Sequence, residues 1–408
     1  MKQLTALLAL CAYAFAQDMQ QMQHDMPHDM HQMHNMNRAG MYLMNMASGT
    51  SMNPYSSRIP MIMTESGNWA LMFMGQGFLV DTQQSGPRGG DKFYSPNWFM
   101  TSAIHPAGAN ASFMLEAMIS LEPATITNRS YPLLFQTGET AYGRPLIDAQ
   151  HPHDFIMSLG FQYANRINRD TMLQFYYAPV GDPALGPVAF PHRVSALEIP
   201  QATLGHHWQD STHIADNVAT VAVRHKWLRL EASGFYGAEP NENRWNIDWG
   251  GMDSYSGRVS AAPNQNWMIQ VSAGHLAQPE RNEPGNVTRV TASAAYTRNG
   301  WSSSFIWGRN IKHEDSTNSW LAETVVPFRR RNYLTGRIEV VDKDELSVPG
   351  IHRVQSYIAG YTRDIGDFKH VQSGLGANIS AYVIPGALRG AYGNHPFGVN
   401  IYLRLRLK

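Results

Sequence analysis

Residues 155–177, FIMSLGFQYANRINRDTMLQFYY, carry the pattern that decides the fold. Apolar side chains recur at every second position in both arms of this stretch: Phe155, Met157, Leu159, Phe161 and Tyr163, then Leu173, Phe175 and Tyr177. Successive side chains of a strand leave opposite faces, so this period of two predicts two strands, each with one apolar face. The polar residues 165–170 between the arms predict a turn. The stretch is therefore expected to form a β-hairpin with one apolar and one mixed face.

The same hairpin unit recurs from about residue 67 to the C-terminus, which predicts an all-β chain of about sixteen strands. Charges occupy only one face of these strands; Leu228 and Leu230, for example, alternate with Arg229 and Glu231. Short turns alternate with long connections over 122–152, 179–215, 238–254 and 384–396. This layout is typical of a transmembrane antiparallel β-barrel with both termini in the periplasm. A soluble β-sandwich shares the periodicity but does not explain the alternation of loop lengths.

The N-terminus has the features of a secretory signal peptide over residues 1–16. Lys2 precedes an apolar run from Leu4 to Ala14, and Ala14-Phe15-Ala16 is a small-x-small cleavage site. Cys11, the only cysteine, lies inside the signal, so the mature chain is expected to lack thiol and disulfide chemistry. Lipid anchoring through Cys11 is disfavoured by the bulky Leu10 before it. No later stretch is long and apolar enough for a membrane-spanning helix, so we expect a barrel in the cell outer membrane.

Residues 17–66 differ in composition from the rest of the chain. They are expected to form a disordered Met/His-rich periplasmic arm and linker in front of a barrel over 67–408. Equal numbers of basic and acidic residues, 32 each, argue against a nucleic-acid partner, and the lipid bilayer is the expected one. Ser211 lies near Asp210 and His213, but no Gly-x-Ser-x-Gly elbow is present, and we expect no enzyme activity.

The arm carries the most specific chemical signal in the sequence. Thioethers and imidazoles follow one another through it: Met19, Met22, His24, Met26, His28, Met30, His31, Met33, His34 and Met36. Thioethers favour Cu(I), and imidazoles suit both Cu(I) and Cu(II), so the mixture predicts binding of copper ions without a thiol. The alternative is a low-complexity linker, although ordinary linkers are built from Gly, Ser, Pro and Glu rather than Met.

A Met/His-rich arm, Met19 to Met46, in front of an outer-membrane barrel resembles the copper resistance protein B family. The resemblance covers the signal, the arm and the general layout, and it implies a role in copper tolerance at the outer membrane. The barrel blocks 181–187, GDPALGP, and 206–213, HHWQDSTH, resemble uncharacterised bacterial exported proteins and imply no activity.

A second candidate metal site lies in the two longest loops. It comprises the side chains His151 and His153 of one loop and His206, His207, Asp210 and His213 of the other. Imidazoles and carboxylates at such spacing can ligate Zn²⁺ or Cu²⁺. The loops are expected to meet over one sector of the barrel mouth and to fold inward. The alternative is that these side chains hydrogen-bond loop backbone and fix a plug.

Together these features predict an outer-membrane barrel involved in copper export or tolerance. The arm is expected to capture copper ions at the periplasmic mouth, with periplasmic metal-handling proteins as partners. Two alternatives remain open. One is a general porin or small-solute channel with an incidental arm, and the other is a structural or adhesive surface barrel that uses its long loops.

Overall fold

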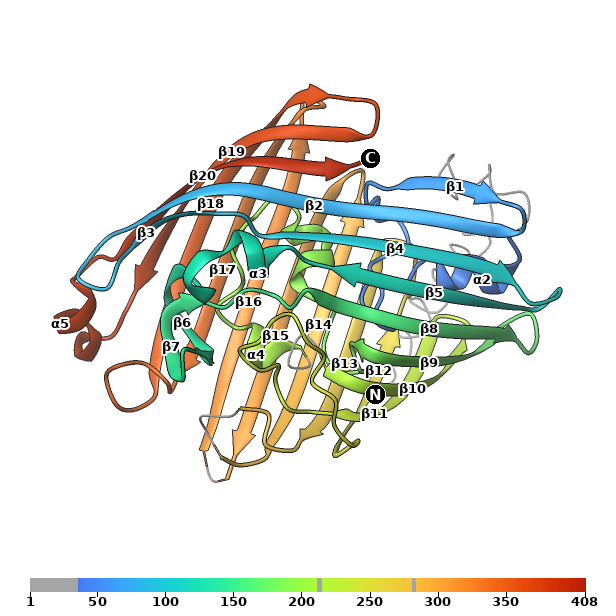
Figure 1. The fold of residues 1–408 in the computed structure, drawn as a ribbon, viewed down its shortest axis with the longest axis horizontal. Coiled ribbons are helices and arrows are strands. Elements are labelled where there is room, and N and C mark those ends of the chain that lie inside the picture. Colours follow the sequence, from blue (N-terminus) through green and yellow to red (C-terminus); the bar gives the residue numbers. More distant parts are fainter. Residues whose placement is uncertain (1–35, 211–214, 281–283, 314) are drawn as a thin grey trace, which may run out of the picture.

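The computed structural model describes residues 36–210, 215–280, 284–313 and 315–408. In this part of the chain an antiparallel sheet of 18 strands closes on itself, and without the two short strands β1 and β3 it is a barrel of sixteen (Figure 1). The sixteen are β2 Trp69–Gln84, β4 Asn97–Pro106, β5 Ala111–Ile119, β8 Ile156–Arg166, β9 Thr171–Gly181, β10 Ala215–His225, β11 Leu228–Tyr236, β12 Ser254–Ala261, β13 Trp267–Leu276, β14 Val287–Arg298, β15 Trp301–Lys312, β16 Asp315–Phe328, β17 Asn332–Lys343, β18 His352–Asp367, β19 Val371–Val383 and β20 Phe397–Leu407. The predicted all-β barrel of about sixteen strands is confirmed.

The barrel closes where β20 pairs with β2, from Gln76 opposite Arg406 to Gln84 opposite Gly398. The first part of β2 extends past the end of β20, and β1, Ile62–Ser66, pairs with it there. On the other side of β2, β3, Asp91–Tyr94, and β4 pair with successive parts of the strand. The two short strands therefore supply backbone partners along β2 where β20 and β4 do not reach.

The two faces of the wall differ in chemistry as the alternation predicts. Leu230 and Leu405 are 58% and 41% exposed on the outside, whereas their neighbours Arg229 and Arg404 are buried inside. A closed sheet with an apolar exterior and charged residues inside suits a bilayer, because the apolar face contacts lipid. Met157 was expected on the apolar outer face, and this was wrong. Irregular register next to it, at Met118/Ile119 and at Leu159/Phe161, leaves it buried on the inner side.

The two rims of the barrel carry different connections. Short turns at 107–110, 167–170, 226–227, 262–266, 299–300, 329–331 and 368–370 share one rim with the start of β2 and the end of β20. The opposite rim carries the long connections, 120–155 and 182–214 above all. In outer-membrane barrels the short turns are periplasmic, so we call these the periplasmic and the extracellular rim. Among the described residues, no helix has the length and hydropathy of a membrane span.

Three segments occupy the lumen. The first is 36–61, with α2, Arg38–Leu43. The second is 120–155, with α3 Glu122–Thr125, η2 Thr127–Arg129 and the hairpin of β6 Tyr131–Ala141 and β7 Arg144–Gln150. The third is 182–210, with η3 Phe190–His192, η4 Val194–Ala196 and α4 His206–Gln209. The short elements η5, Gly386–Leu388, and α5, Arg389–Tyr392, lie on the extracellular rim. The long loops thus fold inward, as predicted.

The expectation of a disordered arm over 17–66 is wrong for residues 36–66. Asn37 caps α2 by accepting a hydrogen bond from Gly40 N at 2.9 Å, and its side-chain amide donates to the carbonyls of Gly108 and Ala111 at 2.8 Å each. The helix packs Tyr42 and Leu43 against the wall with almost no exposure. This short apolar face is enough because the barrel wall covers it, whereas Arg38 of the same helix is exposed. Residues 1–35, with the predicted signal peptide, lie outside the described residues.

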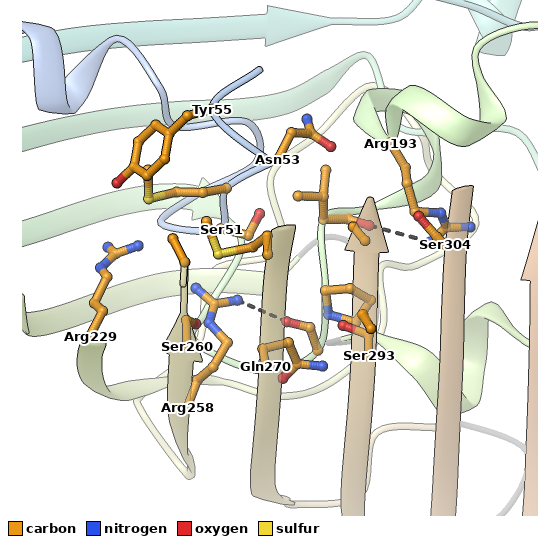
Figure 2. A pocket seen from close by; sticks show the side chains of 18 of the residues that line it. Ser51, Asn53, Tyr55, Arg193, Arg229, Arg258, Ser260, Gln270, Ser293 and Ser304 are labelled. Carbon is orange, nitrogen blue, oxygen red and sulfur yellow. Dashed lines mark hydrogen bonds between the residues drawn. The ribbon is translucent and has the colours of Figure 1, made fainter. Parts of the chain in front are cut away.

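Basic side chains of the wall hold the inserted segments in place. Arg258, Arg337 and Lys343 donate to the backbone carbonyls of Gly186, Gln201 and Leu204 at 2.9, 3.0 and 2.9 Å. Irregular backbone has few internal hydrogen bonds, so it needs such donors when it is buried. Figure 2 shows Arg229 and Arg258 facing Ser51, Asn53 and Tyr55 of the first segment across a cavity of about 40 Å³.

Candidate functional site

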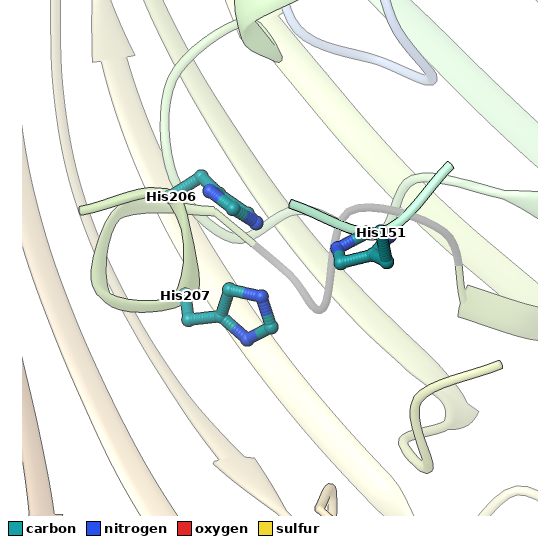
Figure 3. A group of neighbouring side chains, drawn as sticks. All are labelled: His151, His206 and His207. Carbon is teal, nitrogen blue, oxygen red and sulfur yellow. The ribbon is translucent and has the colours of Figure 1, made fainter. Parts of the chain in front are cut away.

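Three histidines from two inserted segments meet in the lumen. His151 follows β7 directly, and His206 and His207 are the first two residues of α4. The structure brings at least one ring nitrogen of each within 4.8 Å of the others (Figure 3). The ring centroids of His206 and His207 are 4.2 Å apart, and each lies about 6 Å from that of His151, at 5.8 and 6.0 Å. All three side chains are buried. We call them the three-histidine group.

Two carboxylates lie against this group. Nε2 of His151 is 3.2 Å from Oε1 of Glu139, and Nδ1 of His207 is 2.8 Å from Oε1 of Glu239. His207, Glu239 and Glu280 form a second set of potential ligands with the same spacing. Two or three imidazoles with a carboxylate are a common ligand set for Zn²⁺ and also suit Cu²⁺. The arrangement can therefore hold a transition-metal ion.

Backbone carbonyls orient two of the imidazoles. Nδ1–H of His206 donates to the carbonyl of Thr203 at 2.7 Å, and Nδ1–H of His151 donates to that of Pro152 at 3.1 Å. In the neutral ring, the proton on Nδ1 leaves the lone pair on Nε2. Such hydrogen bonds to the far nitrogen are usual for metal-bound histidine, because they fix the tautomer and the ring direction.

The charge state of the group also favours a cation. Burial lowers the pKa of His207 to about 3, and burial together with the neighbouring imidazoles lowers the pKa of His151 and of His206 well below the usual value. All three rings are therefore neutral at pH 7, the form that binds metal. Burial raises the pKa of Glu239 to about 8, so a metal ion that used this carboxylate would displace its proton.

The other predicted site residues lie elsewhere. Nδ1 of His153 is 2.9 Å from Oε2 of Glu122, so this side chain does not join the three-histidine group. Asp210 ends α4, and its backbone carbonyl accepts from Arg289. Met36 is the first described residue and packs against the apolar cluster around α2. The remaining predicted ligands, His213 and Met19, Met22, His24, Met26, His28, Met30, His31, Met33 and His34, lie outside the described residues.

Sequence reasoning missed the carboxylates of the site. Glu139 belongs to β6, Glu239 follows β11 and Glu280 follows β13, so they come from three different connections on the extracellular rim. Their only signal in the sequence is an acidic residue in a long connection that shares this rim. The sequence analysis also missed Gly138, whose φ of +101° lets β6 pass the ring of His207. A Cβ at Gly138 would lie 2.6 Å from that ring.

Comparisons with known proteins support the fold. No protein-family model matches the chain, and no curated protein matches it. Among solved structures, OmpF of Salmonella typhi, in a complex with daunomycin, matches with a TM-score of 0.51 at 8% identity, over 84% of this chain and 100% of that one. An anion-selective porin from Comamonas acidovorans matches with a TM-score of 0.50 at 10% identity, over 83% and 99%. The outer-membrane OmpT of Vibrio cholerae gives 0.49 at 8% identity, over 85% and 100%.

At these identities the likeness concerns the fold alone. It agrees with the closed wall, the apolar exterior and the unequal rims, and the chain is an outer-membrane β-barrel with a porin-like fold. The predicted location in the outer membrane and the predicted contact with the bilayer are confirmed. The resemblance to the copper resistance protein B family stays a prediction.

Proposed function

We propose that this protein is an outer-membrane channel for small solutes whose passage is closed by its own inserted segments. The observation that carries the proposal is a porin-like barrel with a charged inner wall and a lumen filled by chain that polar contacts hold there. Here the third segment is fastened through Arg193 to Glu323 at 2.5 Å and through Glu198 to Arg406 at 2.9 Å.

We further propose that a transition-metal ion at the three-histidine group locks this closure. His151 comes from the second inserted segment, and His206 and His207 come from the third. One ion bound to all three would join the two segments to each other inside the lumen. Metal binding would therefore stabilise the closed arrangement by mass action, because it favours only the state in which the ligands meet.

Conductance in planar bilayers tests both statements. Zn²⁺ is expected to lower the conductance of the purified protein, and a chelator is expected to raise it. His207→Gln removes one ligand and should abolish the response to Zn²⁺, whereas His225→Gln, at an exposed position beside the turn 226–227, should keep it. Absence of conductance in the protein and in both variants, with and without chelator, contradicts the channel. Conductance that does not change when Zn²⁺ is added contradicts only the metal lock.

A second candidate function is copper export or tolerance, and one observation favours it. The first inserted segment continues the methionine-rich composition of the arm and places Met44, Met46 and Met52 beside the wall methionines Met72 and Met114. The arm would collect copper ions in the periplasm as cargo and deliver them to this segment. Periplasmic metal-handling proteins are the partners that such a delivery implies.

The copper function is tested by the arm itself. A peptide of residues 17–46 is expected to bind Cu(I) more tightly than micromolar, because soft thioethers and imidazoles suit this ion. Deletion of residues 17–35 should raise the copper sensitivity of the host without changing barrel assembly. Unchanged copper tolerance, with solute permeability still dependent on the barrel, would exclude this function and leave the channel.

A further inference from the structure

Three methionines lie at one level of the lumen on three neighbouring strands. Met74 of β2 is directly opposite Met100 of β4, and Met100 is directly opposite Met118 of β5. Directly opposed residues of antiparallel strands have Cβ atoms about 4.5–5.5 Å apart, with both side chains on the same face. All three are 6% exposed or less, on the inner face of the barrel. These three residues thus form a row over three neighbouring strands on the inner face of the wall, and they belong to one buried cluster.

A histidine from the third inserted segment completes this row. Nε2 of His192, the last residue of η3, lies 2.7 Å from Sδ of Met118. The ring is held against Trp98 with the centroids 4.4 Å apart, and the His192 carbonyl accepts from the side chain of Asn53 at 3.0 Å. Burial lowers the pKa of His192 to about 4, so the imidazole is neutral at pH 7. Nε2–H of the neutral imidazole therefore donates a hydrogen bond to the thioether sulfur, and a metal ion bound here would take the place of this proton, which would move to Nδ1.

The row borders a cavity of about 900 Å³ on the periplasmic half of the barrel. Met74 and His192 line it, and seven of its 21 described lining residues are methionines: Met44, Met46, Met61, Met63, Met72, Met74 and Met114. Its charged lining residues are Arg58, Glu65 and Lys408, and Lys408 follows the periplasmic end of β20. The cavity therefore reaches from the periplasmic rim to the row.

We propose that Met74, Met100, Met118 and His192 bind a soft monovalent metal ion, Cu(I) or Ag(I), that arrives from the periplasm through this cavity. Three thioethers and an imidazole are soft and intermediate ligands, and no carboxylate is among them, so the set favours these ions over Zn²⁺ or Mg²⁺. The site is separate from the three-histidine group. Its biological role rests on the copper function proposed above, whereas its existence does not.

The ordinary use of buried methionine is to fill gaps in a core, and the distribution in this barrel argues against that use. Eight methionines of the sixteen strands are buried on the inner side, and seven of them lie on the five strands β2, β4, β5, β8 and β9: Met72, Met74, Met100, Met114, Met118, Met157 and Met172. The eleven remaining strands, as far as the structure describes them, contribute Met268. Gap filling has no reason to concentrate in one sector, whereas a path for a soft ion does.

Silver binding to the full mature protein in detergent tests the site, with Ag(I) as a redox-inert probe and equilibrium dialysis with elemental analysis as the readout. The double variant Met100→Leu/Met118→Leu keeps side-chain volume, and it is expected to bind one Ag(I) fewer than the wild type. The matched control Met172→Leu/Met268→Leu removes two buried lumenal methionines outside the row and should bind as many ions as the wild type. Equal binding by the two variants would overturn the site.

A second measurement decides the matter if the first variant does not fold. Crystals of the wild type soaked in Ag(I) should show an anomalous peak bonded to Sδ of Met118 and Nε2 of His192, with these two atoms farther apart than the 2.7 Å that separates them without the ion. Silver confined to other methionines would overturn the proposal. Bilayer conductance tests the channel function independently of this site. Loss of Ag(I) binding with normal conductance would overturn the metal site and keep the channel function. Absence of conductance with Ag(I) still bound would overturn the channel function and keep the metal site.

Discussion

Substitution of Glu198 by Gln is expected to open the channel. Its carboxylate, in the third inserted segment, accepts from Arg404 and, at 2.9 Å, from Arg406 of β20. The Glu198 and Arg404 side chains are 1% and 0% exposed. Removing one partner of a buried pair costs about 3–5 kcal/mol. The amide still accepts one hydrogen bond and Arg404 keeps Asp364, so the lower end, about 3 kcal/mol, applies. This raises the ratio of molecules with the third segment displaced from the lumen to molecules with the segment in place by roughly 100-fold.

Single-channel recording measures this ratio as open time divided by closed time, which should rise by roughly 100-fold in Glu198→Gln. The matched control is Asp342→Asn, which also replaces a carboxylate in an ion pair. Its partner Arg353, at 2.7 Å, belongs to the neighbouring wall strand, so no inserted segment is released and gating should not change. A Glu198→Gln protein that is folded, as judged by a gel mobility that changes only on heating, and that opens no more often than the wild type would refute the reasoning.

Three further changes have defined outcomes. Gly138→Ala places a Cβ against the His207 ring and should weaken Zn²⁺ binding at least about 10-fold, as measured by titration. The control Gly143→Ala is also at positive φ but has open space around its Cβ, so this variant should bind Zn²⁺ like the wild type. Burial and the nearby Asp210 raise the pKa of Asp182 to about 8. The folded state therefore holds this proton more tightly than the unfolded state does. The wild type should lose thermal stability as the pH rises from about 4 to 8, because the folded state then loses the proton. Asp182→Asn has no such proton, and a melting temperature that falls equally in both proteins would exclude Asp182 as the cause. Asn37→Ala removes the cap of α2, worth about 1 kcal/mol, and should speed proteolysis within 36–61; equal cleavage rates would contradict the anchoring role of this cap.

The strands could be predicted because alternation is a local property of the sequence. Leu230 faces out and Arg229 faces in as expected, since each position needs only its neighbours. Met157 could not be placed, because the irregular register beside it depends on how two other strands pair with β8. For the same reason the sequence does not show that Met100 and Met118 lie opposite each other. That alignment depends on the pairing of β4 with β5.

The candidate site was predictable only in part. His151, His206 and His207 could be proposed together because both loops are long and leave the same rim. Glu139 and Glu239 could not, because irregular backbone carries them into the lumen and no periodicity describes such a path. Residues 36–61 were misjudged for a related reason: their composition is too polar for a core of their own, but the barrel supplies the surrounding wall.

The pairing of β2 with β20 has a consequence for biogenesis. The seam joins strands from opposite ends of the sequence, so the wall cannot be sealed until the last eleven residues before Lys408 have been delivered to the assembly site. Until then the wall has two open edges, so the inserted segments can enter the lumen between these edges as well as from the extracellular rim. A passenger domain fused in front of Met36 would remain on the periplasmic side, because Asn37 is tied to the turn at Gly108.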